Sequence, residues 1–173
     1  MRWILIAVVV LGALVSIVAG VGALLPKGHV ASRTARLRQP AEAVWSAITD
    51  YAGAPSWRTE LARVERLPDR NGHEVWSEVS KRGEVMPLET LESVPPRRLV
   101  RKIADPKLPF GGAWTIEITP SDSGSDLRIT ENGEVYNPIF RFISRFVIGH
   151  TATIDGYLKA LGKRFGEEIV PSN

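Results

Sequence analysis

The stretch Gln39–Tyr51 reads QPAEAVWSAITDY and provides the first landmark of the fold. Its proline suits the first position of a helix, where the missing N–H would have no partner in any case. Val44, Trp45 and Ile48 follow at the i, i+1, i+4 spacing of a buried stripe. The pattern predicts an amphipathic helix over Pro40–Tyr51, which the next four residues, AGAP, bring to an end.

Strand-like segments lie on both sides of this helix. Before it, Gly28–Arg38 alternates small or apolar residues with polar ones, as a strand with one buried face does. After a second short helix expected at residues 56–58, six runs are separated by turn-forming residues. The six predicted strands are Leu61–Leu67, His73–Lys81, Met86–Val94, Arg98–Ala104, Gly112–Thr119 and Asp126–Tyr136.

Helical patterns return at the end of the chain. Phe140–Ile148 has apolar residues at helical spacing, and a longer amphipathic helix follows Gly149 and His150. The apolar face of that helix contains Ile154, Tyr157, Leu158, Leu161 and Phe165. Strands in one cluster followed by a helix indicate an α+β fold with an antiparallel sheet, not a βαβ fold. One face of such a sheet needs a cover, which the terminal helix can supply.

The N-terminal segment has the composition of a membrane helix. Trp3–Leu25 contains no charged residue, and about 20 residues are enough to cross a hydrocarbon core of about 30 Å. We therefore expect an anchor over residues 1–26 and one folded domain over residues 27–173. The alternative is a cleaved signal peptide, whose apolar core is usually shorter and for which Val21–Ala23 is a possible cleavage site.

The charges beside the apolar segment bear on its orientation. Arg2 precedes it, whereas Lys27, Arg33, Arg36 and Arg38 follow it closely. The positive-inside rule then favours a single-pass protein with a cytoplasmic domain. Because the three later arginines fall in a predicted strand, the side of the membrane stays open.

Composition excludes several classes of function. The 22 basic and 19 acidic side chains give a net charge of only +3, and no basic run stands out, so nucleic acid is not an expected partner. The absence of cysteine excludes disulfides, thiolate nucleophiles and Cys-based zinc sites. The three histidines have no metal-ligand spacing, so we expect neither a metal site nor a cofactor.

The order of elements resembles the helix-grip superfamily, which includes START domains, the birch-pollen allergen family and polyketide cyclase/dehydrase-like proteins. The local similarity is the proline and P-x-x-V-W pattern of Gln39–Tyr51, with the aspartate that closes the helix and Trp57 a few residues later. The resemblance implies a curved sheet that grips the C-terminal helix, with a cavity between them for an apolar or amphipathic ligand. It implies no single reaction.

Two charged residues are predicted on inward strand faces. Arg101 shares a face with Leu99 and Ile103, and Glu131 shares one with Leu127 and Ile129. A buried charge needs a partner, so the two could pair with each other or bind the polar end of a ligand. Glu131 could also act as an acid or base if burial raises its pKa.

Each assignment of this charged pair has a structural alternative. Asn132-Gly133 directly follows Glu131 and is a bulge signal that can switch the face of the strand. Arg101 could instead extend its head to water at the rim of the cavity.

Aromatic residues are candidates for a cavity wall, although ordinary core packing would explain each of them. Two segments could lie near the mouth of the cavity. Lys107–Gly112 fits either a gate to the cavity or an ordinary connecting loop. Phe140–Ile148 fits either a cap over the cavity or a segment that lies on the lipid surface. The aromatic candidates for ligand binding are Trp76, Phe110, Trp114 and Tyr157.

The resulting hypothesis is a membrane-tethered domain that binds or transfers a hydrophobic, lipid-like small molecule. A cyclase/dehydrase-type enzyme is the first alternative, with Glu131 as acid/base and Arg101 polarising a carbonyl. A non-enzymatic interaction module of a membrane complex is the second.

Overall fold

The computed structural model describes residues 1–173 and contains one antiparallel sheet of seven strands. All seven predicted strands are present, and the strand order is β1-β7-β6-β5-β4-β3-β2. The first strand thus pairs with the last and brings the segment next to the N-terminal helix into the sheet. The strands are β1 Gly28–Leu37, β2 Leu61–Arg70, β3 His73–Ser80, β4 Val85–Val94, β5 Arg98–Ile103, β6 Phe110–Ser121 and β7 Gly124–Val135.

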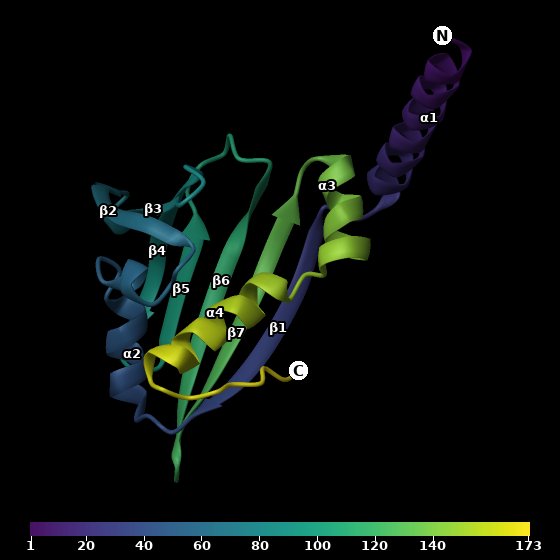
Figure 1. The fold of residues 1–173 in the computed structure, drawn as a ribbon. Helices are drawn as coiled ribbons and strands as arrows, with labels where there is room; N and C mark the ends of the chain where they lie inside the picture. The colour runs from purple at the N-terminus through teal and green to yellow at the C-terminus, as the bar shows by residue number, and fades with distance from the viewer.

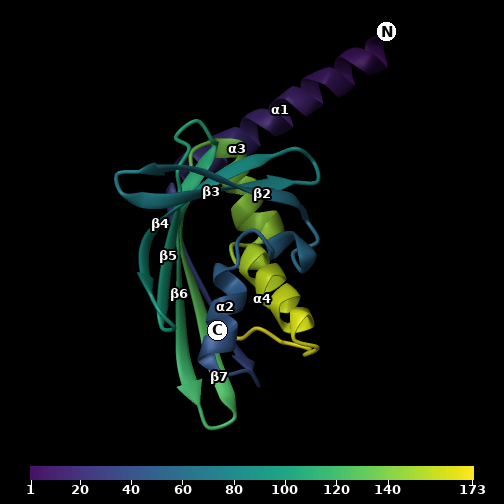
Figure 2. The ribbon, with the colours of Figure 1, turned by 90° about the vertical axis from the view of Figure 1, so that its left-hand side faces the viewer.

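Helices cover one face of this sheet. Figure 2 shows α2 and α4 on the same side of the curved sheet, with the β2–β3 hairpin folded over its far end. This arrangement confirms the α+β class and the helix-grip fold predicted from the order of elements. The helices are α1 Arg2–Leu24, α2 Ala41–Thr49, α3 Pro138–Ile143 and α4 Ala152–Arg164, with a 3-10 turn η1 at Ala54–Ser56 and a π-helical turn η2 at Ser144–Ile148.

The core lies between the sheet and the helices α2 and α4. The predicted apolar face of α4 packs there, and its Leu158 and Leu161 are fully buried. Across from them, Leu127 and Ile129 occupy alternate positions of β7 and are also fully buried. Since alternate residues of a strand share one face, these contacts fix which face of β7 points to α4.

The sheet continues without a bulge past Glu131. In the β6–β7 pair, Asn132 lies opposite Ala113 and Gly133 opposite Gly112, so the register does not shift. A Cβ at Gly112, whose φ is 125°, would overlap the backbone of Asn132, which explains the need for glycine at this close approach. Glu131 therefore keeps the face of Leu127 and Ile129.

Two predicted boundaries are corrected. The second short helix is the 3-10 turn η1, which begins two residues before the predicted 56–58 and ends at Ser56, because Pro55 suits the start of a helical turn. The expected loop Lys107–Gly112 is shorter, because β6 begins at Phe110 and pairs with Val135.

Helix α1 projects away from the folded domain (Figure 1). It has 23 residues and a mean hydropathy of 3.0, and its most apolar window has no buried residue. By length and composition it can cross a membrane, and a signal sequence would have the same features. Its last turn contacts α3, where the Arg141 Nη1 donates to the Leu25 carbonyl oxygen at 2.8 Å.

Candidate functional site

Three of the predicted site residues form a row across the inner face of the sheet. Arg101 on β5 lies opposite Trp114 on β6, and Trp114 lies opposite Glu131 on β7. Neighbouring strands are about 4.8 Å apart, so Arg101 and Glu131 are separated by about two strand spacings with an indole between them. The two charges consequently do not pair with each other, and each has other partners.

Arg101 belongs to a buried ionic cluster that the sequence did not reveal. Its Nη1 lies 3.3 Å from Glu78 Oε1, and Arg58 Nη1 lies 2.8 Å from the same oxygen. The side chains of Arg101 and Glu78 are only 11% and 5% exposed, so Arg101 does not extend its head into water. Burial alone would lower the pKa of Arg58, but Glu78, Tyr157 and Glu60 together more than offset this and raise it. Two guanidinium groups thus share one carboxylate inside the fold.

Several polar atoms of this cluster have no hydrogen-bond partner. They are the Nε and Nη2 of Arg101, the Oε2 of Glu78 and the Nε1 of the neighbouring Trp57. Three of the four are N–H donors. A buried donor without an acceptor is costly, so these groups are suited to bind oxygen atoms of a guest molecule.

Aromatic rings surround the ionic cluster. The Tyr157 ring on α4 meets Trp57 and Trp114 edge-on, with ring centroids 5.4 and 5.6 Å away. The Arg101 guanidinium lies 4.1 Å from the centroid of the Tyr51 ring, within cation–π range. Burial raises the pKa of Tyr157 to about 12, so its hydroxyl stays protonated and can donate a hydrogen bond. The surroundings of the charges are therefore apolar walls with a few hydrogen-bonding groups.

The other two aromatic candidates are placed differently. Trp76 on β3 tilts against Tyr51 at a centroid distance of 5.4 Å and donates its indole N–H to Glu74. It extends the aromatic wall toward β3. Phe110 begins β6 and is 40% exposed, so it lies outside the buried cluster.

At the other end of the row, Glu131 is held by hydrogen bonds. Its Oε2 accepts from the Trp114 indole at 2.8 Å, and its Oε1 lies 3.1 Å from His29 Nε2. The His29 ring in turn stacks on His150 at a centroid distance of 3.9 Å. Burial, the neighbouring His29 and the charge of Arg145 lower the pKa of His150. This end of the row is a carboxylate beside two imidazoles, where β1 meets the start of α4.

Sequence reasoning missed Arg58, Glu78 and the pairing of the two histidines. For Glu78 the usable signal is strand alternation, which puts it on the same face as Trp76. Arg58 follows a turn, and the histidines come from opposite ends of the domain. Neither pattern has a periodicity that would reveal its partner.

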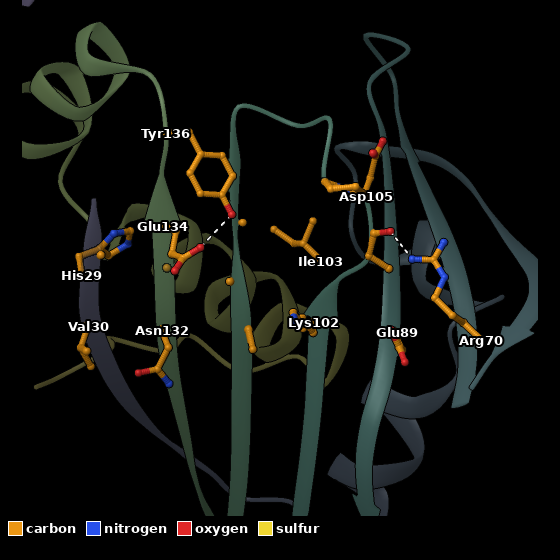
Figure 3. Close-up of a pocket in the computed structure, with 17 residues that line it drawn as sticks. His29, Val30, Arg70, Glu89, Lys102, Ile103, Asp105, Asn132, Glu134 and Tyr136 are labelled. Carbon is orange, nitrogen blue, oxygen red and sulfur yellow. Dashed lines mark hydrogen bonds between the residues drawn. The ribbon is translucent and has the colours of Figure 1, made fainter. Parts of the chain in front are cut away.

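A wide depression lies on the opposite face of the sheet. Figure 3 shows its labelled side chains in front of the strands, with the helices behind the sheet. It has a volume of about 960 Å³, and only five of its 17 lining residues are hydrophobic. Val30, Lys102 and Asn132 contribute to it, each next in sequence to an inward-facing residue. None of the six predicted ligand-binding residues lines this outer depression.

The sheet order, the gripped helix and the polar row inside define a helix-grip domain. The family model described as "Polyketide cyclase / dehydrase and lipid transport" matches residues 29–166. The chain belongs to this family, and the predicted superfamily resemblance is confirmed. No curated protein sequence matches the chain.

Solved structures with low sequence identity share the fold. A START superfamily protein from Mycobacterium smegmatis matches with a TM-score of 0.62 and 18% identity over 79% of this chain and 96% of its own. The ZhuI aromatase/cyclase from Streptomyces sp. R1128 matches with a TM-score of 0.61 and 14% identity over 78% of this chain and 91% of its own. Protein MLL2253 from Mesorhizobium loti matches with a TM-score of 0.59 and 19% identity over 80% of this chain and 96% of its own. At such identities the likeness shows the fold alone.

Proposed function

We propose that this chain is a membrane-anchored helix-grip protein that binds an amphipathic, largely hydrophobic small molecule between the sheet and α4. The observation that carries the proposal is the pair of partnerless N–H groups of Arg101, buried among aromatic rings. A buried guanidinium with unused donors is suited to hold the polar end of a ligand.

The balance of donors and acceptors narrows the ligand class. The partnerless atoms comprise three N–H donors and one carboxylate oxygen, so the polar end should carry oxygen acceptors, as a carbonyl, hydroxyl or carboxylate does. The rings of Trp57, Trp114 and Tyr157 then fit an apolar or aromatic body. Cyclase/dehydrase and lipid-transport activities of the family both concern molecules of this general kind.

The N-terminal helix fits a ligand found in or near a bilayer. α1 is long enough to span a membrane, and only residues 25–27 separate it from β1. A tether this short holds the domain at the membrane surface and raises its effective concentration there. The proposal divides the chain into an anchor over residues 1–26 and the binding domain over residues 27–173, with the domain on the cytoplasmic side.

An enzymatic function is the second candidate, because Glu131 forms a carboxylate–imidazole pair with His29 at 3.1 Å. Such a pair can move a proton to or from a bound carbonyl compound. Glu131→Gln then abolishes turnover and leaves the ligand bound, whereas in a carrier it leaves transfer intact.

Extraction of the purified full-length protein tests the main proposal. The chain in detergent is extracted with organic solvent, and the extract is analysed by mass spectrometry for a stoichiometric compound. We expect a bound amphipathic molecule in the wild type and in Arg97→Gln, which changes an exposed arginine. Arg101→Gln should lose it while it stays folded, since Arg58 still pairs with Glu78. Equal retention by both variants, or no compound in any of them, would overturn the proposal and favour an interaction module.

A further inference from the structure

A smaller pocket lies at the base of the N-terminal helix. It has a volume of about 360 Å³ and is enclosed by the end of α1, the start of β1, the end of β7 and the α3–η2 segment. Figure 1 shows α3 beside the base of α1. We call it the basal pocket; its ten lining residues are Leu25, Pro26, Lys27, Gly28, His29, Val30, Val135, Arg141, Arg145 and His150.

The basal pocket has a strongly one-sided charge. Half of its lining residues are basic or histidine, and none is acidic. No ion pair of the structure includes Lys27, Arg141 or Arg145. Three permanent positive charges therefore meet at one pocket without a carboxylate partner, in a protein with nearly balanced charge overall.

Arg141 is the most informative of the three. The residue is only 9% exposed, and its Nη1 and Nη2 donate to the carbonyl oxygens of Leu25 and Tyr136 at 2.8 and 3.3 Å. Its Nε is buried and has no partner. Carbonyl groups orient the guanidinium but do not neutralise it, and a buried charge without a counter-ion is costly. The site is thus suited to an anion.

The position of the pocket indicates where the anion would come from. Leu25, Pro26 and Lys27 directly follow α1, so the proposed anchor, on which this inference rests, puts the pocket at headgroup depth. The neighbouring α3–η2 segment also exposes large apolar side chains, as segments that lie in a membrane interface do. They are Phe140, Phe146, Val147 and Ile148.

We propose that the basal pocket binds the phosphate of an anionic phospholipid headgroup. Arginine and lysine donate charge-assisted hydrogen bonds to phosphate oxygens, and a phosphate would supply the missing counter-ion to Arg141. Lys27 and Arg145 flank the pocket from the anchor and from η2, so a bound headgroup would link the anchor to the grip domain. Free inorganic phosphate has the same chemistry and is the other possible source.

The test uses the full-length protein in nanodiscs and a charge-matched control. Lys27→Gln/Arg145→Gln removes two pocket charges and leaves the structural contacts of Arg141 in place. Lys81→Gln/Arg82→Gln removes two exposed charges at the β3–β4 turn. Native mass spectrometry counts retained phosphatidylglycerol against phosphatidylcholine, and a second arm adds inorganic phosphate to phosphatidylcholine nanodiscs.

We expect selective retention of phosphatidylglycerol by the wild type and the control. Affinity should fall about 25-fold in the pocket variant, from roughly fivefold for each of the two basic residues at a membrane surface. Saturable binding of inorganic phosphate, lost in the same variant, would identify free phosphate as the source and overturn the lipid assignment. Equal lipid retention by both variants would overturn the pocket proposal alone. A chain that does not insert into nanodiscs would overturn it together with the proposed anchor.

Discussion

Glu78 is the side chain on which the inner ionic cluster depends. It is the only carboxylate that Arg58 and Arg101 share, at 2.8 and 3.3 Å, and its side chain is 5% exposed. Removing one partner of a buried ion pair leaves the other charge uncompensated, which is more costly than never having formed the pair. Glu78 therefore orients the Arg101 head for the ligand contact that we propose.

We expect Glu78→Gln to lower the free energy of unfolding by about 3–5 kcal/mol, since the buried Arg101 guanidinium would lose its carboxylate partner and Arg58 would keep only the exposed Glu60. The control is Glu65→Gln, which removes an ion pair with Arg63 whose side chains are more than half exposed. That change should cost about 1 kcal/mol or less. Urea unfolding measures both variants, and equal effects would contradict the buried role of Glu78.

The His150 ring makes stability depend on pH. Its pKa is lowered in the folded protein by burial, His29 and Arg145, whereas in the unfolded chain it should titrate near the usual value of about 6.5. The unfolded state then binds more protons, so this contribution is complete above that value and is lost as pH falls toward the folded pKa. We expect the urea midpoint to drop between about pH 7.5 and pH 5.5 by less in His150→Gln than in the wild type.

Ser144→Ala serves as the matched control for this pH effect. It removes the hydrogen bond between Ser144 Oγ and His150 Nδ1 at 3.0 Å but keeps the titrating ring. The pH-dependent loss should therefore persist in Ser144→Ala. The account of His150 fails if His150→Gln and the wild type lose stability in parallel.

At the residue scale, strand periodicity predicted which faces Arg101, Glu131 and Trp114 present, because alternation is a local property of the chain. It did not predict their partners. Arg58 and Glu78 reach Arg101 only through the curl of the β2–β3 hairpin, and His29 meets His150 only because β1 pairs with β7. Such contacts are set by topology, which no single segment encodes.

At the scale of elements, the join between α1 and α3 depends on one small residue. A Cβ at Gly22 would overlap the backbone of Pro138, whereas a Cβ at Gly20 would meet nothing within 4 Å. In Gly22→Ala the added methyl group would overpack this contact and displace α3 from α1. We therefore expect amide hydrogen exchange in α3, measured in nanodiscs, to be about fivefold faster or more. Gly20→Ala should leave exchange unchanged, and a similar rise in both variants would contradict a specific join.

The packing of α4 on the sheet is a second contact between elements, and its contribution to stability can be measured. Leu158 is fully buried in the core cluster, while the adjacent Lys159 is exposed. Leu158→Ala should lower the free energy of unfolding by about 2–5 kcal/mol, as cavity-forming core substitutions do. Lys159→Ala should change it by less than about 0.5 kcal/mol. A loss below 1 kcal/mol for Leu158→Ala would mean that the grip on α4 is loose.

The helices and strands were largely predictable from hydrophobic periodicity and turn residues. The predictions were wrong only about where some of these elements begin or end. The side chain of Asn137 accepts from the backbone N–H groups of Ile139 and Phe140, which turns β7 sharply into α3 and fits the predicted end of the sheet. The extension of β6 back to Phe110 was missed, because the Gly111-Gly112 pair is typical of a loop and joins the sheet only through β7.

For the whole molecule, the important feature is the short connection between α1, which we propose as a membrane anchor, and the folded domain, which we propose binds a ligand. The chain between α1 and β1 has only three residues, and Arg141 ties its first carbonyl to α3. If α1 is an anchor, the intact mass of the membrane-extracted protein should include residues 1–26. A mature chain that begins near residue 24 would instead identify α1 as a cleaved signal sequence.

The central claim is that the ligand binds inside the grip, and a structure of the ligand-loaded protein tests it most directly. We expect an oxygen atom of the ligand within hydrogen-bonding distance of the Arg101 Nε or Nη2, with its apolar body against Trp114 and Tyr157. A ligand bound instead in the outer depression near Lys102 and Asn132, with Arg101 unchanged, would contradict the claim.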